Sequence, residues 1–92
     1  MLMKEVMYKV PGGKLLRVKV RVRNEKIAAV IICGDFFVYP EEGIGVIEAS
    51  LRGVMKGEIN ERIRKIVEEN KIEFVGMAIE DVANTIERCF EE

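Results

Sequence analysis

The stretch LRVKVRVR, Leu16–Arg23, decides the fold of this chain. Apolar and basic residues alternate strictly along it, and a period of two places successive side chains on opposite faces of a β-strand. The apolar face holds Leu16, Val18, Val20 and Val22, and the basic face holds Arg17, Lys19, Arg21 and Arg23. The sequence therefore predicts a half-buried strand with one charged face.

Two further strands flank this one. Upstream, VMYKV (6–10) is a strand-like run that ends at the turn-forming tripeptide PGG (11–13). Downstream, a two-residue turn (24–25) leads into a run whose residues 27–33 are apolar on both faces, so it is expected to be the most covered strand. Short connections join antiparallel neighbours, and a three-stranded antiparallel meander is therefore predicted.

After Pro40 the apolar spacing changes from two residues to three or four, which is typical of amphipathic helices. The first helix is expected to start at Pro40, with Glu41 and Glu42 in its first turn, where the helix dipole favours acids. Gly53 is expected to end this helix. Its apolar positions are Ile44, Ile47, Leu51 and Val54.

Two more helices complete the chain. Ile59–Glu69 carries one apolar stripe and has Asn70 as its C-cap, and Ile72–Gly76 is a short apolar connector. The last helix has Glu80 and Asp81 in its first turn. Its apolar positions are Ile79, Val82, Ile86 and Phe90. Strands followed by helices predict an α+β fold, a three-stranded antiparallel meander followed by three helices packed on one face.

Length and composition describe a single globular domain, residues 1–92, with 49% hydrophobic and 34% charged residues. The net charge of -1 disfavours nucleic acid as the partner. No run approaches the roughly 18 apolar residues of a membrane span, and no signal peptide is recognised, so a cytoplasmic protein without membrane contact is expected. His, Gln and Trp are absent while Lys, Arg and Glu are abundant, a skew that resembles hyperthermophile proteins.

Residues that commonly carry catalysis are scarce. The chain has no His and a single Ser, Ser50, so a nucleophilic triad of the usual type cannot form. Its two cysteines, Cys33 and Cys89, cannot make a four-thiolate metal site; they are expected to be buried free thiols, with a disulfide as the alternative. The adjacent Glu41 and Glu42 suit helix capping better than acid–base work. No catalytic residue, metal ligand or phosphate-binding loop is therefore assigned.

Two polar features are candidate binding elements, and each has a plain structural alternative. The turn PGGK, Pro11–Lys14, either closes a hairpin or brings backbone amides and the Lys14 ammonium to an anion. The basic face of Leu16–Arg23 either is solvated, with Glu5 and Glu25 as cross-strand partners, or meets an acidic protein, a nucleotide or RNA.

The third candidate is the adjacent pair Phe36-Phe37, which follows Gly34 and Asp35 at a strand exit. Gly34 is expected to mark a β-bulge. Successive strand residues point to opposite faces, so one ring can join the core while the other cannot easily do so. The remaining ring is then a natural anchor for a partner protein, because aromatic side chains concentrate interface energy.

Three stretches in this order resemble a known family. They are VPGGKLLRV (10–18), GDFFVYPEEGIGVIEASLRG (34–53) and VGMAIEDVANTI (75–86). Together they are similar to the C-terminal accessory domain of lipoate-protein ligase, in its free-standing archaeal form, and the resemblance runs from about Tyr8 to Phe90. Its elements are the GGK and GDFF turns, the PEE segment, and Glu48, Leu51 and Gly53 in an E..L.G pattern.

The resemblance implies a small α+β subunit that forms a heterodimer with a large catalytic subunit. In that family the large subunit holds ATP, Mg and lipoate, lipoate is activated to lipoyl-AMP, and the lipoyl group is transferred to a lysine of lipoyl-domain proteins. The small subunit carries no catalytic residue but is needed for activation. The residues expected here to contact the large subunit or to support activation are Gly12, Gly13, Lys14, Gly34, Asp35, Phe36 and Phe37.

Two alternatives come from other functional classes. A nucleotide- or RNA-binding module would use the basic strand face, although the aromatics that stack on single-stranded bases are not interleaved with its cations. A sulfur carrier or iron–sulfur scaffold would need an exposed reactive thiol or several metal ligands, and Cys33 is expected to lie covered in an apolar strand.

Overall fold

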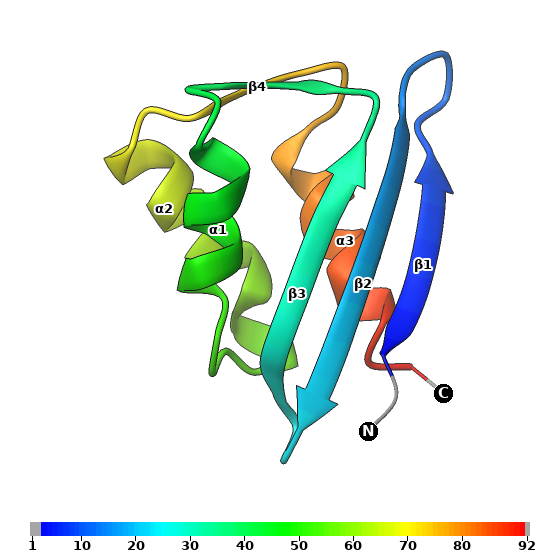
Figure 1. Cartoon of the computed structure of the whole chain (residues 1–92), viewed down its shortest axis with the longest axis vertical. Helices are drawn as coiled ribbons and strands as arrows, with labels where there is room; N and C mark the ends of the chain where they lie inside the picture. The colour runs from blue at the N-terminus through cyan, green and yellow to red at the C-terminus, as the bar shows by residue number, and fades with distance from the viewer. Residues whose placement is uncertain (1–2, 92) are drawn as a thin grey trace.

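A computed structural model describes residues 3–91 of the chain. Three antiparallel strands form the main sheet in the order β1-β2-β3, with β2 in the centre (Figure 1). The strands are β1 (Lys4–Lys9), β2 (Leu15–Arg23) and β3 (Lys26–Gly34). The predicted meander is confirmed. In its second turn, Asn24 and Glu25 have φ values of 53° and 64°. Positive φ at both central residues is what a two-residue hairpin turn needs if its twist is to match that of the strands.

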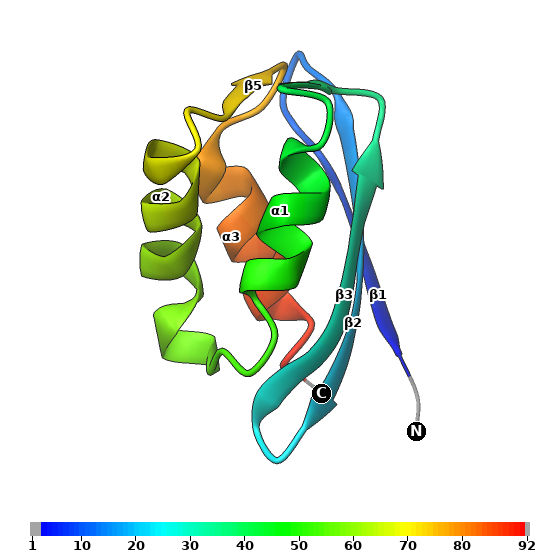
Figure 2. The ribbon, with the colours of Figure 1, turned by 60° about the vertical axis from the view of Figure 1, so that its left-hand side comes forward.

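The alternation in β2 decides which way the sheet faces. Leu16, Val18 and Val20 are fully buried, whereas the four basic residues between and after them are exposed. Turning the molecule shows all three helices on the same side of the sheet (Figure 2). Helices α1 (Gly43–Ser50) and α3 (Ile79–Arg88) pack directly on the strands, and α2 (Ile59–Glu69) packs mainly on α1 and α3. The α+β architecture is therefore confirmed, with α2 forming an outer layer.

The expectation that residues 27–33 form the most covered strand is wrong. In β3 only one face is buried, by Ile27, Val30 and Ile32, while Ile31 keeps 47% of its surface exposed. The reason is that β3 lies at the edge of the sheet and the helices cover a single face. The apolar residues on the outer face of β3 are therefore exposed to solvent, and among the described residues no second layer of helices or strands covers them.

The helices are α1 (Gly43–Ser50), α2 (Ile59–Glu69) and α3 (Ile79–Arg88), with a 3₁₀ turn, η1 (Lys56–Glu58), before α2. The predicted bounds of the second helix are confirmed, and Asn70 is its C-cap, with Nδ2 donating to the Ile66 carbonyl oxygen at 3.0 Å. The predicted acids in the first turn of α3 are also confirmed, and the Asp81 carboxylate accepts a hydrogen bond from the Ala78 N–H at 2.9 Å.

The first helix is shorter than predicted. It begins at Gly43, so Pro40 and the two acids that follow it lie before the helix and supply no side-chain cap. The chain is still extended at Tyr39 because it pairs there with another strand, and a turn closed by the Gly43 N–H and the Pro40 carbonyl oxygen (2.9 Å) precedes the helix. The helix ends at Ser50, ahead of Gly53, whose N–H instead donates to the Ile27 carbonyl oxygen at 2.8 Å.

A second, two-stranded sheet was not predicted. Strand β4 (Phe37–Tyr39) pairs antiparallel with β5 (Glu73–Val75), which the sequence analysis treated as a connector. This ribbon crosses one end of the molecule, above the start of α1 and next to the far end of β3 (Figures 1 and 2). Each strand has only three residues, so neither shows a period of its own, and the pair forms only because the helices bring the two segments together.

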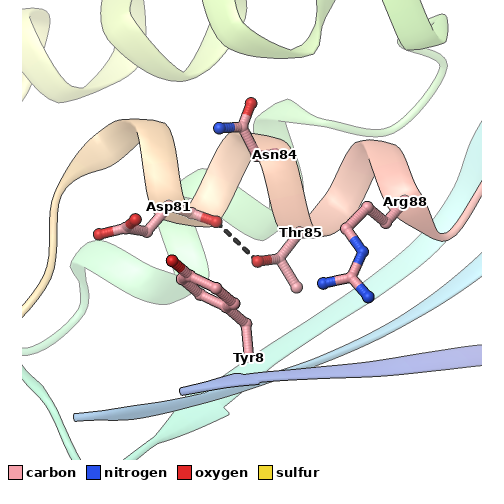
Figure 3. Close-up of a pocket in the computed structure, with 5 residues that line it drawn as sticks. All are labelled: Tyr8, Asp81, Asn84, Thr85 and Arg88. Carbon is pink, nitrogen blue, oxygen red and sulfur yellow. Dashed lines mark hydrogen bonds between the residues drawn. The ribbon is translucent and has the colours of Figure 1, made fainter. Parts of the chain in front are cut away.

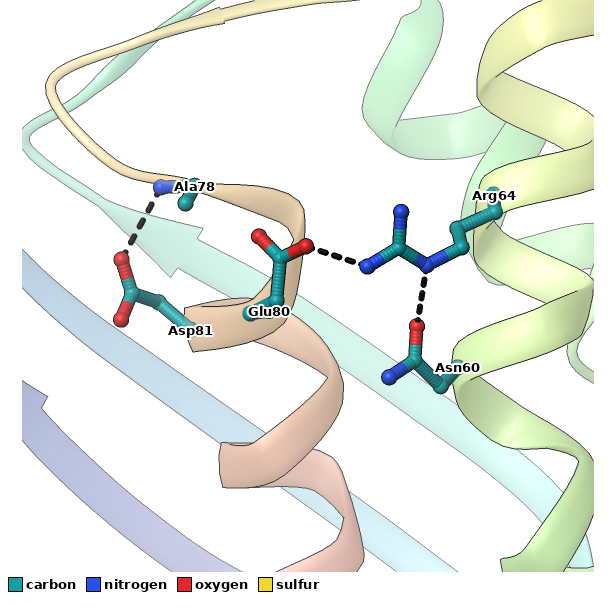
Figure 4. Close-up of polar contacts among 5 residues, drawn as sticks. All are labelled: Asn60, Arg64, Ala78, Glu80 and Asp81. Carbon is teal, nitrogen blue, oxygen red and sulfur yellow. Dashed lines mark hydrogen bonds and ion pairs between the residues drawn. The ribbon is translucent and has the colours of Figure 1, made fainter.

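A polar link joins α2 and α3. The Arg64 guanidinium on α2 forms an ion pair with Glu80 on α3, and its Nε donates to the Asn60 side-chain oxygen at 2.9 Å (Figure 4). A hydrogen bond from the backbone N–H of Glu80 lowers the pKa of the Glu80 carboxyl, and the Arg64 charge adds to this.

Candidate docking site

The two turns identified in the sequence meet in the structure. The Asp35 carboxylate accepts a hydrogen bond from the Leu15 N–H at 2.7 Å, and the Asp35 N–H donates to the Leu15 carbonyl oxygen at 3.3 Å. Leu15 directly follows the PGGK turn, so these two bonds fix the PGGK and GDFF turns to each other. Gly12, Gly13, Lys14, Gly34 and Asp35 therefore lie at one end of the sheet.

Gly34 ends β3 and does not mark a β-bulge. The register irregularity of the sheet lies between Arg21 and Val22 instead. A Cβ atom at Gly34 would overlap the Leu15 carbonyl oxygen and lie 2.8 Å from the Phe36 ring. The glycine thus permits the close backbone approach that the Asp35–Leu15 hydrogen bonds require.

The PGGK segment closes the hairpin between β1 and β2. The Val10 N–H donates to the Lys14 carbonyl oxygen at 2.9 Å, and Gly12 has φ +69°. Lys14 is half-buried, and its aliphatic stem lies over Gly76, where a Cβ atom would come within 2.6 Å of the Lys14 Cγ. The turn after β5 is thereby packed against the PGGK turn. Within residues 3–91 the Lys14 ammonium has no ion-pair partner.

The two adjacent phenylalanines separate as the strand period predicts. Phe36 is half-buried, and its ring lies 6.2 Å, centroid to centroid, from Phe74 of β5 at a tilt of 54°. Phe37 keeps 60% of its surface exposed. Its neighbours across and along the ribbon, Val75 and Tyr39, are 51% and 59% exposed. We call Phe37, Tyr39 and Val75 the apolar ledge.

Tyr39 and Val75 are site residues that were not predicted from the sequence. Phe37 and Val75 are register partners, and Tyr39 is two residues from Phe37, so all three belong to the outward face of the ribbon. The exposed–inward–exposed alternation of both three-residue strands appears only once the two strands pair, so the sequence held no signal for it. These grouped apolar side chains make the ledge a candidate interaction surface.

A second missed residue is Glu48 of α1. Its carboxylate accepts a hydrogen bond from the Ile32 N–H of β3 at 2.8 Å. Because β3 is an edge strand, this N–H points away from the sheet and has no strand partner. The Glu48 carboxylate therefore gives this backbone N–H at the sheet edge a hydrogen-bond partner. The bond also connects α1 to β3, the strand that leads to the GDFF turn.

The basic face of β2 is exposed as predicted. Glu5 forms a cross-strand ion pair with Arg17 at 3.6 Å, whereas Glu25 forms none within the described residues. Cys33 lies on the same outer face and is exposed, which corrects the expectation that both thiols are buried. Cys89 is buried against the helical layer, both cysteines are free, and burial raises the pKa of the Cys89 thiol.

A small polar hollow lies between β1 and α3 (Figure 3). Its volume is about 150 Å³, and it is lined by Tyr8, Asp81, Asn84, Thr85 and Arg88. The Asp81 carboxylate already accepts from Ala78, and the Thr85 hydroxyl donates to the Asp81 carbonyl oxygen at 2.7 Å. Two of its polar groups are thus committed to the structure of α3.

Residues 3–91 contain no cluster of three or more carboxylate or thiol side chains that could hold a metal ion. Among the same residues no helix combines the length and the hydropathy needed to cross a membrane.

Comparisons with known proteins agree with the resemblance carried by the three sequence stretches. No protein-family model matches the chain. The chain is 36% identical over 58 residues to lipoate-protein ligase A subunit 2 of Thermoplasma acidophilum, and this match spans 63% of the chain and 62% of that protein. The similarity to a subunit of a lipoate-protein ligase is therefore a property of the sequence itself.

The fold is similar as well. A chain in the solved structure of an archaeal lipoylation system from Thermoplasma acidophilum, which comprises a bi-partite lipoate protein ligase and its E2 lipoyl domain, superposes with a TM-score of 0.82. The two chains are 29% identical, and the match covers 92% of this chain and 94% of the other. The expected resemblance to a free-standing small subunit is thus confirmed in sequence and in fold.

Proposed function

We propose that this chain is the non-catalytic small subunit of a two-component lipoate-protein ligase in the cytoplasm. It binds a large catalytic subunit as a heterodimer and is required for ATP-dependent activation of lipoate to lipoyl-AMP. The lipoyl group is then transferred to a lysine of a lipoyl-domain protein. ATP, Mg and lipoate are bound by the large subunit.

The observation that best supports this proposal is the match in fold over nearly the whole length of both chains, because the other chain belongs to the structure of a bi-partite ligase and its E2 lipoyl domain. The residues of this chain are consistent with an accessory role. It lacks His, and at the end where the two turns meet, Asp35 and Lys9 hydrogen-bond to the turns while the Lys14 stem packs on Gly76.

The apolar ledge is the surface that we assign to the large subunit. Phe37 is its most exposed member, and Asp35 and Gly34 hold the backbone of its turn in one conformation. A rigid aromatic anchor loses little conformational entropy on binding. Docking there would exclude water from a neighbouring adenylation site and strengthen the electrostatic interactions within that site.

Lys14 lies at the end where the two turns meet and can reach an anion on the partner. Its stem is held against Gly76, while its ammonium has no ion-pair partner within the described residues. An ammonium positioned in this way contributes a point charge without a large ordering cost. We assign it a supporting role beside the phosphates bound by the large subunit.

The test is lipoate-dependent pyrophosphate release by a large subunit of the same organism, measured with and without this chain. We expect activity only in the mixture. Phe37→Ala should weaken the binding of the large subunit by about 10- to 100-fold, since truncation of a central aromatic costs on the order of 2 kcal/mol. Met55→Ala is the matched control, because Met55 is an exposed apolar residue (45%) bridged to the opposite end of β3.

Three results would contradict the proposal. The first is a large subunit that releases pyrophosphate equally well alone, and the second is a failure of the two chains to co-purify. The third is an equal loss of binding for Phe37→Ala and Met55→Ala, which would show that the ledge has no special role.

A further inference from the structure

We infer that the outer face of the three-stranded sheet is a second docking surface, complementary to an acidic surface on the large subunit. This inference rests on the proposed function and extends the contact from the apolar ledge to the uncovered side of the sheet. Figure 2 shows that side without any helix over it.

The charge of the outer face is strongly biased. Its cations are Arg17, Lys19, Arg21 and Arg23 of β2 together with Lys26, the register partner of Arg23. We call these five residues the cationic face. Two carboxylates lie beside them: Glu5, which pairs with Arg17 at 3.6 Å, and Glu25, which lies in the turn between Arg23 and Lys26. The whole chain has a net charge of -1. The rest of the molecule is therefore negatively charged, and the positive charge is concentrated on this face.

Apolar side chains are interleaved with these cations. Met7 is the register partner of Arg17 and is 56% exposed, and Ile31 is the register partner of Lys19 and is 47% exposed. Met and Arg are enriched at protein–protein interfaces. The same face carries no aromatic residue within the described strands, whereas single-stranded nucleic acid is bound by stacking on aromatics. The composition therefore favours a protein partner over RNA.

The area of the apolar ledge is too small for a stable heterodimer by itself. Two aromatic rings that are about 60% exposed supply on the order of 200–300 Å², while a standard interface buries about 800 Å² on each partner. A three-stranded face with strand spacing near 4.8 Å and a central strand of nine residues adds about 400 Å². The two surfaces together approach the standard size.

The ledge and the outer face are also continuous. Cys33, which is the register partner of Arg17 on the outer face, and Phe37 of the ledge line the same shallow hollow of about 260 Å³. Gly34 lies between them in the chain and lines it too. The hollow also touches α1 through Ile44, so one partner can cover the end of the molecule, pass the edge of β3 and reach the open sheet.

The test is a charge-reversal double variant, Lys19→Glu/Arg21→Glu, titrated calorimetrically against the large subunit at about 0.05 M and 0.5 M salt. We expect at least a tenfold loss of affinity at low salt and a much smaller loss at high salt, because exposed charges are screened. The matched control is Lys56→Glu/Lys65→Glu, which changes the charge equally at exposed sites on η1 and α2. Circular dichroism melts check that both variants fold.

The outcomes separate the two proposals. Equal binding by the sheet variant, the control variant and the unchanged chain would overturn this inference, and a loss for Phe37→Ala in the same assay would leave the proposed function standing. If the unchanged chain itself fails to bind the large subunit, the proposed function is wrong. If the sheet variant loses binding to a fluorescent single-stranded RNA but not to the large subunit, the face is a nucleic-acid site and the inference is overturned.

Discussion

At the scale of single residues, glycine positions determine how closely the two turns approach. Gly34 lies where any Cβ would overlap the Leu15 carbonyl oxygen, a backbone atom that is fixed by hydrogen bonding to Asp35. Gly45 differs in both respects, since it lies in α1 and a Cβ there would meet nothing within 4 Å. The same chemical change should therefore have opposite effects at the two positions.

We predict that Gly34→Ala lowers the free energy of unfolding by roughly 2–4 kcal/mol, because the backbone must move and the Asp35–Leu15 bonds are lost. Gly45→Ala should raise it by about 0.5–1 kcal/mol through the lower entropy of the unfolded chain. Urea denaturation of both variants and the unchanged chain measures this. Equal destabilisation by both substitutions would contradict the prediction, because the close contacts at Gly34 would then not distinguish it from an open position in α1.

At the scale of elements, one carboxylate joins a helix to the edge of the sheet. The Ile32 N–H on β3 donates to Glu48 of α1 at 2.8 Å. Removal of the acceptor leaves a partly buried backbone donor unsatisfied, which costs more than the bond itself contributes. A Gln at this position keeps one acceptor oxygen in a side chain of the same length.

We predict that Glu48→Ala destabilises the fold by about 1–2 kcal/mol and that Glu48→Gln costs less than half of that. Hydrogen exchange at the Ile32 amide should become faster in Glu48→Ala and change little in Glu48→Gln. If the Ile32 amide exchanges at the same rate in all three proteins, the Glu48 contact does not protect this edge.

The elements also show where the sequence is sufficient for prediction. Ile59–Glu69 is a helix with the predicted bounds because its apolar stripe and its Asn70 cap are both local signals. The start of α1 could not be predicted in the same way. Tyr39 is held in an extended conformation by β5, a segment more than 30 residues away in the chain, so local capping rules do not apply to the residues that follow it.

At the scale of the whole molecule, the two cysteines report which side of the sheet is covered. Cys33 is exposed on the outer face, and Cys89 is buried on the helical side, where burial raises its thiol pKa. The thiolate is the reactive form, so both burial and the raised pKa slow the reaction of Cys89.

We predict that the native chain shows one fast-reacting thiol with a disulfide reagent at neutral pH and that the unfolded chain shows two. Cys33→Ser should remove the fast phase, and Cys89→Ser should leave it unchanged. Two fast thiols in the native chain would mean that the helical layer opens readily. Addition of the large subunit should slow the Cys33 reaction if the outer face is covered in the heterodimer.

The sequence by itself determined the α+β class, the meander, the extent of α2 and the division of β2 into an apolar and a basic face. These follow from periods of two and 3.6 residues and from caps, which act between neighbours in the chain. It also identified the PGGK and GDFF turns and predicted that one of two adjacent Phe rings would be left outside the core.

Only the tertiary structure decided which surfaces remain open. The pairing of β4 with β5 places Tyr39 and Val75 beside Phe37, and the packing of every helix on one face leaves Ile31 and Cys33 exposed. The hydrogen bonds between Asp35 and Leu15 bring the two turns together across 20 residues of chain. Contacts of this kind depend on the positions of distant segments, and the local periodicity of the sequence carries no information about them.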